Sequence, residues 1–129
     1  MDFSDFVGLP WKDRGRGPEY DCWGLVVAVF AAGTGIELPS HDGLYTSAAA
    51  RAETAQVFAG EVGDWLEVPR DSEVPFDAAV MKIAGGFHIG MIVRRGLMLH
   101  MPRAKLSVIE PLSRFEAVLL GIYRHKGLR

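Results

Sequence analysis

Residues 21–33 read Asp-Cys-Trp-Gly-Leu-Val-Val-Ala-Val-Phe-Ala-Ala-Gly, and this stretch decides the fold. Aspartate often caps the start of a helix and glycine often follows its end, so the stretch predicts a helix of about three turns that begins at Cys22 and is closed by Gly33. Its side chains are apolar on nearly every side, which is typical of a buried central helix. The valines would also suit a strand, but the length and the flanking residues favour a helix.

The remainder of the chain predicts an antiparallel sheet that follows the helix. Short apolar or alternating runs bounded by turn residues indicate strands at residues 78–83, 87–94, 97–101, 106–110 and 118–124. Residues 47–60 are rich in alanine and predict a second, exposed helix, whereas residues 34–45 and 63–76 carry no regular pattern. Helices followed by a run of strands indicate an α+β fold, here a central helix packed on a four- to five-stranded antiparallel sheet. We expect residues 1–129 to form a single domain.

The bulk properties of the chain exclude several classes of protein. The chain has 129 residues, a formal net charge of −2 and 49% apolar residues. We therefore expect a well-formed core, and no nucleic-acid partner because no basic stripe is present. No apolar run approaches the roughly 18 to 20 residues that cross a bilayer, so no membrane span is predicted. The N-terminus lacks the positive and apolar regions of a secretory signal, so we expect synthesis in the cytoplasm without one.

The single cysteine is a candidate nucleophile because of its position. One cysteine allows neither an internal disulfide nor a zinc site of paired cysteines. A lone cysteine is more often a buried packing residue, but Cys22 stands at the start of the predicted helix, directly after the Asp21 cap. Unpaired N–H groups and the positive end of the helix dipole favour a thiolate there.

Two of the four histidines could serve as partners of Cys22. His41 lies in a loop and His125 in a basic tail, so we expect no catalytic role for either, whereas His88 and His100 lie in predicted strands. A two-residue turn between these strands would point the two rings to opposite faces of the sheet. A three-residue turn at residues 94–96, with Gly96 in a left-handed conformation, sets His100 opposite Gly90 and leaves His88 as its diagonal neighbour on the same face.

We predict the three-residue turn, because glycine is preferred at its third position. Cys22 would then give its proton to His88, and His100 would orient the His88 ring by accepting from or donating to its second nitrogen. The backbone N–H of Cys22 could contribute to an oxyanion hole.

Several motifs together resemble the NlpC/P60 cysteine peptidases. They are Gly8-Leu9-Pro10-Trp11, Arg14-Gly15, the block Asp21-Cys22-Trp23-Gly24-Leu25-Val26, His88-Ile89-Gly90 and Leu99-His100, with Pro75-Phe76-Asp77 similar to a Pro-Gly-Asp step. The resemblance covers residues 8–123. It implies a papain-like α+β domain in which Cys22, His88 and His100 form the catalytic triad, and in which no cofactor or metal is needed.

By the same resemblance, the substrate would be a peptidoglycan stem peptide, cleaved between D-glutamate and diaminopimelate. Two features, the Trp23 that follows the cysteine and the pattern from Trp11 to Gly15, are similar to those of a branch of the family found in phage tails and gene transfer agents. A tail would carry the enzyme to the cell wall. Cell-wall members usually have Ser and Tyr where this chain has Trp23 and Trp11, so the resemblance implies substrate contacts at these two residues and at Asp21, which can meet an amine.

Three other interpretations use the same residues. The chain could be a structural tail-assembly protein with an idle cysteine site and a stable partner, for which exposed Trp11 and Trp23 would suit a docking surface. Cys22, His88 and His100 could instead bind zinc with an open position. Finally, the same thiol chemistry would serve an acyltransferase or a thioesterase.

Overall fold

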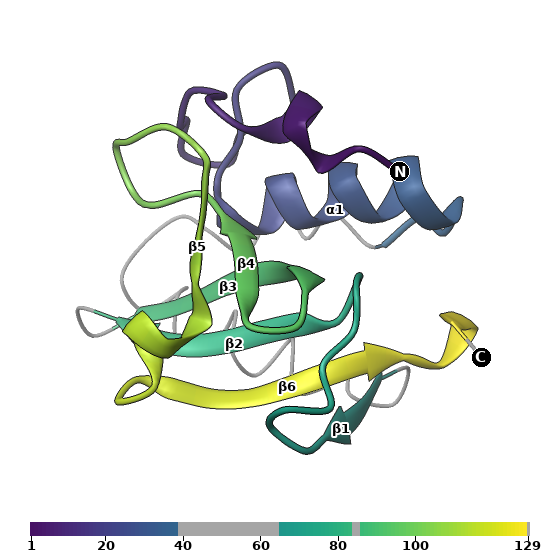
Figure 1. Cartoon of the computed structure of the whole chain (residues 1–129). Coiled ribbons are helices and arrows are strands. Elements are labelled where there is room, and N and C mark those ends of the chain that lie inside the picture. Colours follow the sequence, from purple (N-terminus) through teal and green to yellow (C-terminus); the bar gives the residue numbers. More distant parts are fainter. Residues whose placement is uncertain (39–64, 84–85, 129) are drawn as a thin grey trace.

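The computed structural model describes residues 1–38, 65–83 and 86–128, and these form one helix layer on a curved antiparallel sheet (Figure 1). The helix α1 spans Cys22–Thr34. The six strands are β1 (Trp65–Val68), β2 (Ala78–Ile83), β3 (Gly86–Arg94), β4 (Leu97–His100), β5 (Val108–Pro111) and β6 (Leu119–His125). Short 3-10 turns η1 (Phe3–Phe6), η4 (Leu112–Phe115) and η5 (Lys126–Leu128) complete the described elements.

The sheet has the order β1-β6-β2-β3-β4-β5 with every pair antiparallel, so the α+β architecture predicted from sequence is confirmed. The five predicted strands are present with shifts of one or two residues at their ends. The sixth, β1, lies in the stretch that was expected to be irregular. It has only four residues and pairs with the C-terminal strand through Trp65 and His125, so its sequence is too short to show an alternating pattern.

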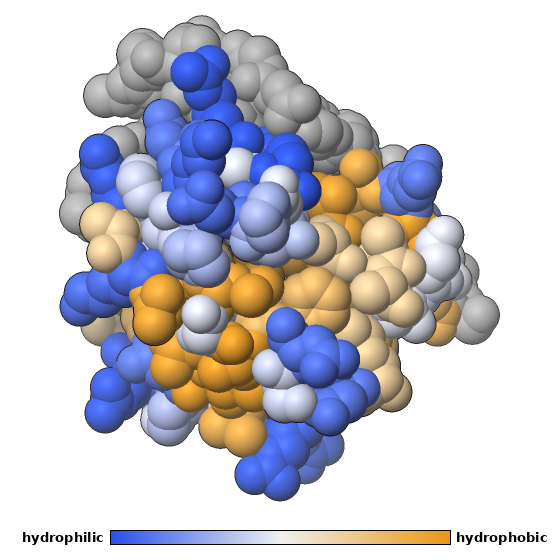
Figure 2. All heavy atoms as spheres, turned by 90° about the horizontal axis from the view of Figure 1, so that it is seen from above, coloured by the Kyte–Doolittle hydropathy of each residue, from blue (hydrophilic) through white to orange (hydrophobic). Residues whose placement is uncertain are grey.

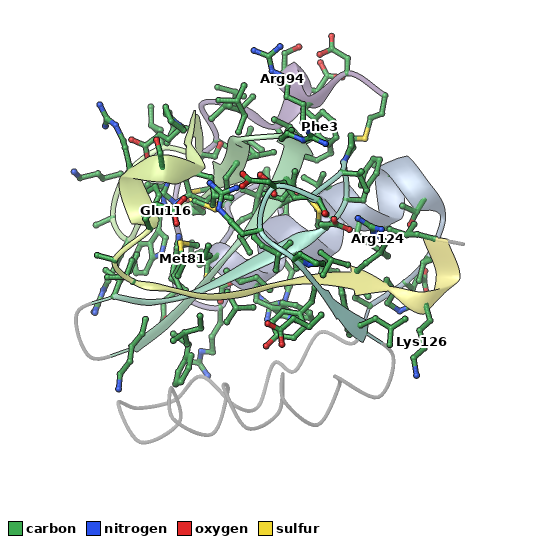
Figure 3. The ribbon with its side chains drawn as sticks, turned by 60° about the horizontal axis from the view of Figure 1, so that its bottom comes forward. Phe3, Met81, Arg94, Glu116, Arg124 and Lys126 are labelled. Carbon is green, nitrogen blue, oxygen red and sulfur yellow. The ribbon has the colours of Figure 1, made fainter. Side chains whose placement is uncertain are left out.

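The alternation of side chains along the strands produces two cores. On one face, Leu25, Val29 and Phe30 of α1 pack against strand residues such as Met91 and Leu99. On the other face, Met81, Ile92 and Met98 pack with Leu112 and Ile122. Arg124 projects from β6 and donates to both carboxylate oxygens of the buried Asp77 at 2.9 Å, tying β6 to the start of β2 (Figure 3).

The end of α1 differs from the expectation. The helix runs past Gly33 to Thr34, and the residue that ends it is Gly35, in a left-handed conformation with φ 75°. Gly33 has a packing role instead, because a Cβ there would lie 2.2 Å from Cζ of Phe76. Phe76 itself has φ 74°, a conformation that favours glycine, and its ring packs 5.3 Å from that of Phe3.

The predicted helix at residues 47–60 and His41 lie outside the described residues. His125, expected in an exposed tail, is the last residue of β6, and its ring packs 5.0 Å from Trp65 and 5.4 Å from Phe30. No helix in the described ranges is long and apolar enough to cross a membrane.

Candidate active site

Cys22 is the first residue of α1 and lies where the helix begins against β3. The Asp21 side chain caps the helix by accepting from the N–H of Gly24 at 2.6 Å. Strand β4 ends at His100, which pairs with Gly90, so β3 continues beyond the last pair. There the N–H of Ile89 donates to the sulfur of Cys22. The half-buried thiol is thus held beside the backbone of the residue that follows His88.

The two strand histidines are hydrogen-bonded to each other. Nε2 of His88 lies 2.8 Å from Nδ1 of His100, and the rings meet edge to face with centroids 5.1 Å apart. This agrees with the predicted register, in which His100 faces Gly90 and His88 is its diagonal neighbour. The three-residue turn predicted at residues 94–96 is not formed, and the extra residue that shifts the register lies elsewhere. Arg94 pairs with Leu97 across a two-residue turn, and the irregularity lies in β3 between Ile92 and Arg94.

Gly90, the glycine of the His-x-Gly motif, makes room for this pair. A Cβ at position 90 would lie 2.3 Å from Sδ of Met98 and 3.1 Å from Cβ of His100. The absence of a side chain therefore lets both residues pack over β3. Met81, labelled in Figure 3, is fully buried and lies directly opposite His88 in β2, on the same face of the sheet. These apolar neighbours remove water from the histidine rings.

Glu110 extends the pair by a third polar side chain. Its Oε2 lies 2.5 Å from Nε2 of His100, and its Oε1 accepts from Arg114 at 3.2 Å. The sequence analysis did not identify Glu110. Val108 pairs with His100, which makes Glu110 a diagonal neighbour of His100 on the same face. Glu110 could have been identified from the sequence only if the relative register of β4 and β5 had been known.

The electrostatics of the site favour neutral groups at rest. Burial, together with the nearby Asp21 carboxylate, raises the pKa of Cys22 to about 11. Burial and the nearby positive charge of His100 lower the pKa of His88 to about 4. Burial also lowers the pKa of His100, against the opposing effect of Glu110. Burial and Asp21 thus oppose the thiolate that is expected at the start of the helix, whereas the backbone N–H groups of Ile89 and Trp23 favour it.

Asp21 is already engaged by the protein itself. Nη1 of Arg16 donates to Oδ1 of Asp21 at 2.9 Å and to the carbonyl oxygen of Gly15 at 2.8 Å. Asp21 is 6% exposed, and burial raises its pKa while the Gly24 N–H and Arg16 oppose that shift. A substrate amine that bound Oδ1 would therefore compete with Arg16.

The two tryptophans of the predicted substrate site have different environments. Trp23 is 4% exposed and belongs to the core between α1 and the sheet, so the expectation that it lies exposed beside the cleft is wrong. Trp23 lies in the first turn of α1 and packs in this apolar core, and burial of so large a ring is strongly favourable. Trp11 is half-buried and pairs with Tyr20, next to the helix cap.

Trp11 also lines an open groove of about 280 Å³, with Pro10, Ala104, Lys105 and Leu106. The groove lies where the N-terminal segment pairs with the segment that leads into β5, through the bridge of Pro10 with Leu106. Figure 2 looks down on the side of the molecule that carries the N-terminal segment and shows hydrophobic surface bordered by hydrophilic residues. Leu106 is 57% exposed and Val7 41% exposed, so apolar side chains are available here to a ligand.

The zinc interpretation finds no geometric support in the part of the chain that the structure describes, where no group of three His, Cys, Asp or Glu side chains is placed to hold a metal ion. Within the same ranges, hydrogen bonds join His88 to His100 and His100 to Glu110, while the sulfur of Cys22 is held by backbone. Catalytic hydrogen bonds are often completed only when substrate binds.

Comparison with known proteins gives the same architecture. The sequence model of the NlpC/P60 family matches residues 8–118. Among solved structures, the NlpC/p60 domain of the peptidoglycan hydrolase SagA superposes with a TM-score of 0.63 at 16% identity, covering 93% of this chain and 90% of that one. The P60 domain of an antigen from M. avium subspecies paratuberculosis gives 0.60 at 20% identity, covering 95% and 88%.

A longer NlpC/P60 family protein from Bacillus cereus superposes with a TM-score of 0.65 at 23% identity, covering 93% of this chain but 36% of that one. The present chain therefore spans about a third of that protein. Identities this low establish a shared fold. A comparison with proteins of curated function finds no match.

Proposed function

This chain belongs to the NlpC/P60 family, whose members are generally cysteine peptidases or hydrolases, and we propose that it hydrolyses peptidoglycan stem peptides with Cys22 as the nucleophile. The observation that supports the proposal is the hydrogen-bonded pair of His88 and His100, together with the N–H of Ile89, the residue after His88, which donates to the sulfur of Cys22. In nucleophilic cysteine catalysis the general base is commonly oriented by a third polar group, and His100 can orient His88 in this way.

The proposed reaction is an acyl transfer to sulfur followed by hydrolysis. Because Nε2 of His88 is bound to His100, Nδ1 is the nitrogen that takes the thiol proton as the sulfur of Cys22 attacks the peptide carbonyl. The backbone N–H of Cys22, at the helix start, donates to the oxyanion. His88 then gives the proton to the leaving amine, and a thioester remains. Water, deprotonated by His88, hydrolyses the thioester, and the proton returns to Cys22.

Because Cys22 and His88 are both neutral before substrate attack, His88 acts as a general base and does not form a thiolate–imidazolium ion pair with Cys22 in the resting protein. A thiol with its pKa near 11 carries little thiolate at neutral pH, so deprotonation has to accompany attack. His88, with a pKa of about 4, is neutral and able to accept a proton through the whole neutral range. We therefore expect activity to fall only in acid, when His88 becomes protonated.

The groove beside Trp11 is the proposed binding site for the stem peptide. Trp11 and Leu106 supply apolar contacts, and Lys105 supplies a positive charge that suits the carboxylates of such peptides. We further propose that the bond cleaved lies between D-glutamate and diaminopimelate and that the protein acts at the cell wall as part of a phage tail. The general resemblance to the family supports the first point, and the motifs around Trp11 and Trp23 support the second.

The test is hydrolysis of purified stem-peptide fragments, followed by mass spectrometry of the products. Cys22→Ala should abolish cleavage, and His88→Gln should reduce it by about 10²-fold or more, the usual contribution of a positioned base. His125→Gln is the matched control, because it removes a histidine that packs on Trp65, at the other edge of the sheet. Cleavage that persists in Cys22→Ala would refute the proposal.

A non-catalytic structural role is the second candidate, and the raised pKa of Cys22 is the observation that favours it. An idle thiol should react with iodoacetamide only in alkaline solution and at the same rate in His88→Gln. An assisted thiol should react faster near neutral pH in the wild type than in the variant. Equal rates together with no peptide cleavage would make the structural role the better description.

A further inference from the structure

Glu110 ends a chain of three polar side chains that crosses three neighbouring strands. His88 lies on β3, His100 on β4 and Glu110 on the edge strand β5. The two contacts are 2.8 Å between the rings and 2.5 Å from His100 to the carboxylate. His100 is 3% exposed, so its ring nitrogens depend on these two partners rather than on water.

The chemistry of these three groups determines which atom donates and which accepts in each of the two hydrogen bonds. An ionised carboxylate can only accept, so Nε2 of His100 must carry a proton and donate it to Glu110. A neutral His100 then has a lone pair on Nδ1, which has to accept from Nε2–H of His88. A neutral His88 with its proton on Nε2 has its lone pair on Nδ1, the nitrogen that must receive the proton of Cys22.

The opposite arrangement would block the reaction. If His100 carried its proton on Nδ1 and donated it to Nε2 of His88, then His88 would be protonated on Nδ1 and could accept nothing from the thiol. Both arrangements satisfy the contact between the two rings equally well. The carboxylate of Glu110 is the group that distinguishes them, since only the first arrangement offers it a donor.

We propose that Glu110 is a positioning residue that holds His100, and through it His88, in the tautomers that leave Nδ1 of His88 free to take the proton of Cys22; this rests on the proposed function. Glu110 acts through His100 and is not placed on the substrate. Its negative charge also stabilises the imidazolium that forms when His88 accepts the proton.

The surroundings of the chain are compatible with this role. Arg114 of η4 donates to Oε1 of Glu110 and leaves Oε2 to His100. Phe115 packs edge to face on His100 with centroids 5.2 Å apart, and His88 faces the ring from β3. Asp21 and Arg16 pair with each other at the helix cap. Among the residues that the structure describes, Glu110 is the carboxylate with a hydrogen bond to the histidine pair.

The direct test reads the ring protons by NMR of protein with ¹⁵N-labelled histidine. In the wild type at neutral pH, His88 and His100 should both be neutral and protonated on Nε2. In Glu110→Gln, whose amide can donate as well as accept, a second form protonated on Nδ1 should appear for both rings. Glu67→Gln is the matched control, on the opposite edge strand β1, and should leave both rings unchanged. Wild-type rings protonated on Nδ1, or a Glu110→Gln spectrum equal to that of the wild type, would overturn the proposal.

The second readout is the rate of peptide cleavage. Glu110→Gln should lower kcat by roughly tenfold or more with little change in KM, as expected for loss of a hydrogen bond to a charged group. Glu110→Asp, which keeps the charge, should recover part of the loss. If no protein cleaves peptides while the tautomers shift as expected, the proposed function fails and the positioning role stands. If the wild type cleaves and Glu110→Gln matches it in rate and spectrum, the positioning role fails alone.

Discussion

Acidification should destabilise the fold through His88. Burial and the charge of His100 lower the pKa of His88 from 6.5 to about 4. Between these values the unfolded chain binds a proton that the folded protein does not, so the free energy of unfolding decreases as the pH falls. The stabilisation is complete above pH 6.5 and is lost toward pH 4, where the loss reaches about 3 kcal/mol.

The assay is urea unfolding at pH 7 and pH 4, followed by tryptophan fluorescence, in the wild type and in His88→Gln. The glutamine amide can still donate to His100 but does not titrate. Carboxylates such as Glu73, whose pKa is lowered by its hydrogen bonds and by Arg70, lose stabilisation in both proteins. The difference between the two therefore isolates His88. The wild type should lose about 3 kcal/mol more than the variant, and equal losses would refute the reasoning.

Two further predictions concern α1. Gly33→Ala, which in an ordinary helix would stabilise by about 1 kcal/mol, should instead destabilise by about 1–3 kcal/mol, because the new Cβ meets Phe76 at 2.2 Å; a higher melting temperature would contradict this. Asp21→Ala removes the acceptor for Gly24 N–H and should cost about 1–2 kcal/mol in urea unfolding. Because the same carboxylate raises the pKa of Cys22, the variant should also alkylate faster at pH 8, and an unchanged rate would contradict that cause.

The elements of the fold that could be predicted from the sequence are those set by local chemistry. Asp21 begins α1 because an aspartate at that position satisfies the unpaired N–H of Gly24. The shared face of His88 and His100 followed from the preference of glycine for the turn at residue 96, where φ is 80°. The predicted pairing of His100 with Gly90 is correct even though the extra residue lies in β3 rather than in the turn, because an extra residue at either place shifts the pairing of the strands by one.

The features that could not be predicted depend on contacts between distant segments. Gly33 and Gly35 are both glycines near the end of the apolar stretch, and the helix ends at Gly35 while Phe76, from a different part of the chain, packs against Gly33. Trp23 was expected to lie exposed beside the cleft, but it is 4% exposed and belongs to the core between α1 and the sheet. The Glu110 contact requires the pairing of β4 with β5, which the intervening loop does not encode.

Two carboxylates would have opposite effects on the proposed proton transfer from Cys22 to His88. Asp21 adds to the effect of burial in raising the pKa of the thiol, which opposes the thiolate, whereas Glu110 opposes the burial that lowers the pKa of His100 and so favours positive charge on the histidine pair. Arg16 moderates the first effect because it pairs with Asp21 at 2.9 Å and lowers the pKa of Cys22. A substrate carboxylate that drew Arg16 away would restore the full charge of Asp21 and suppress the thiolate. A substrate that left Arg16 in place would not, so in the proposed reaction the helix cap would influence which peptides are cleaved.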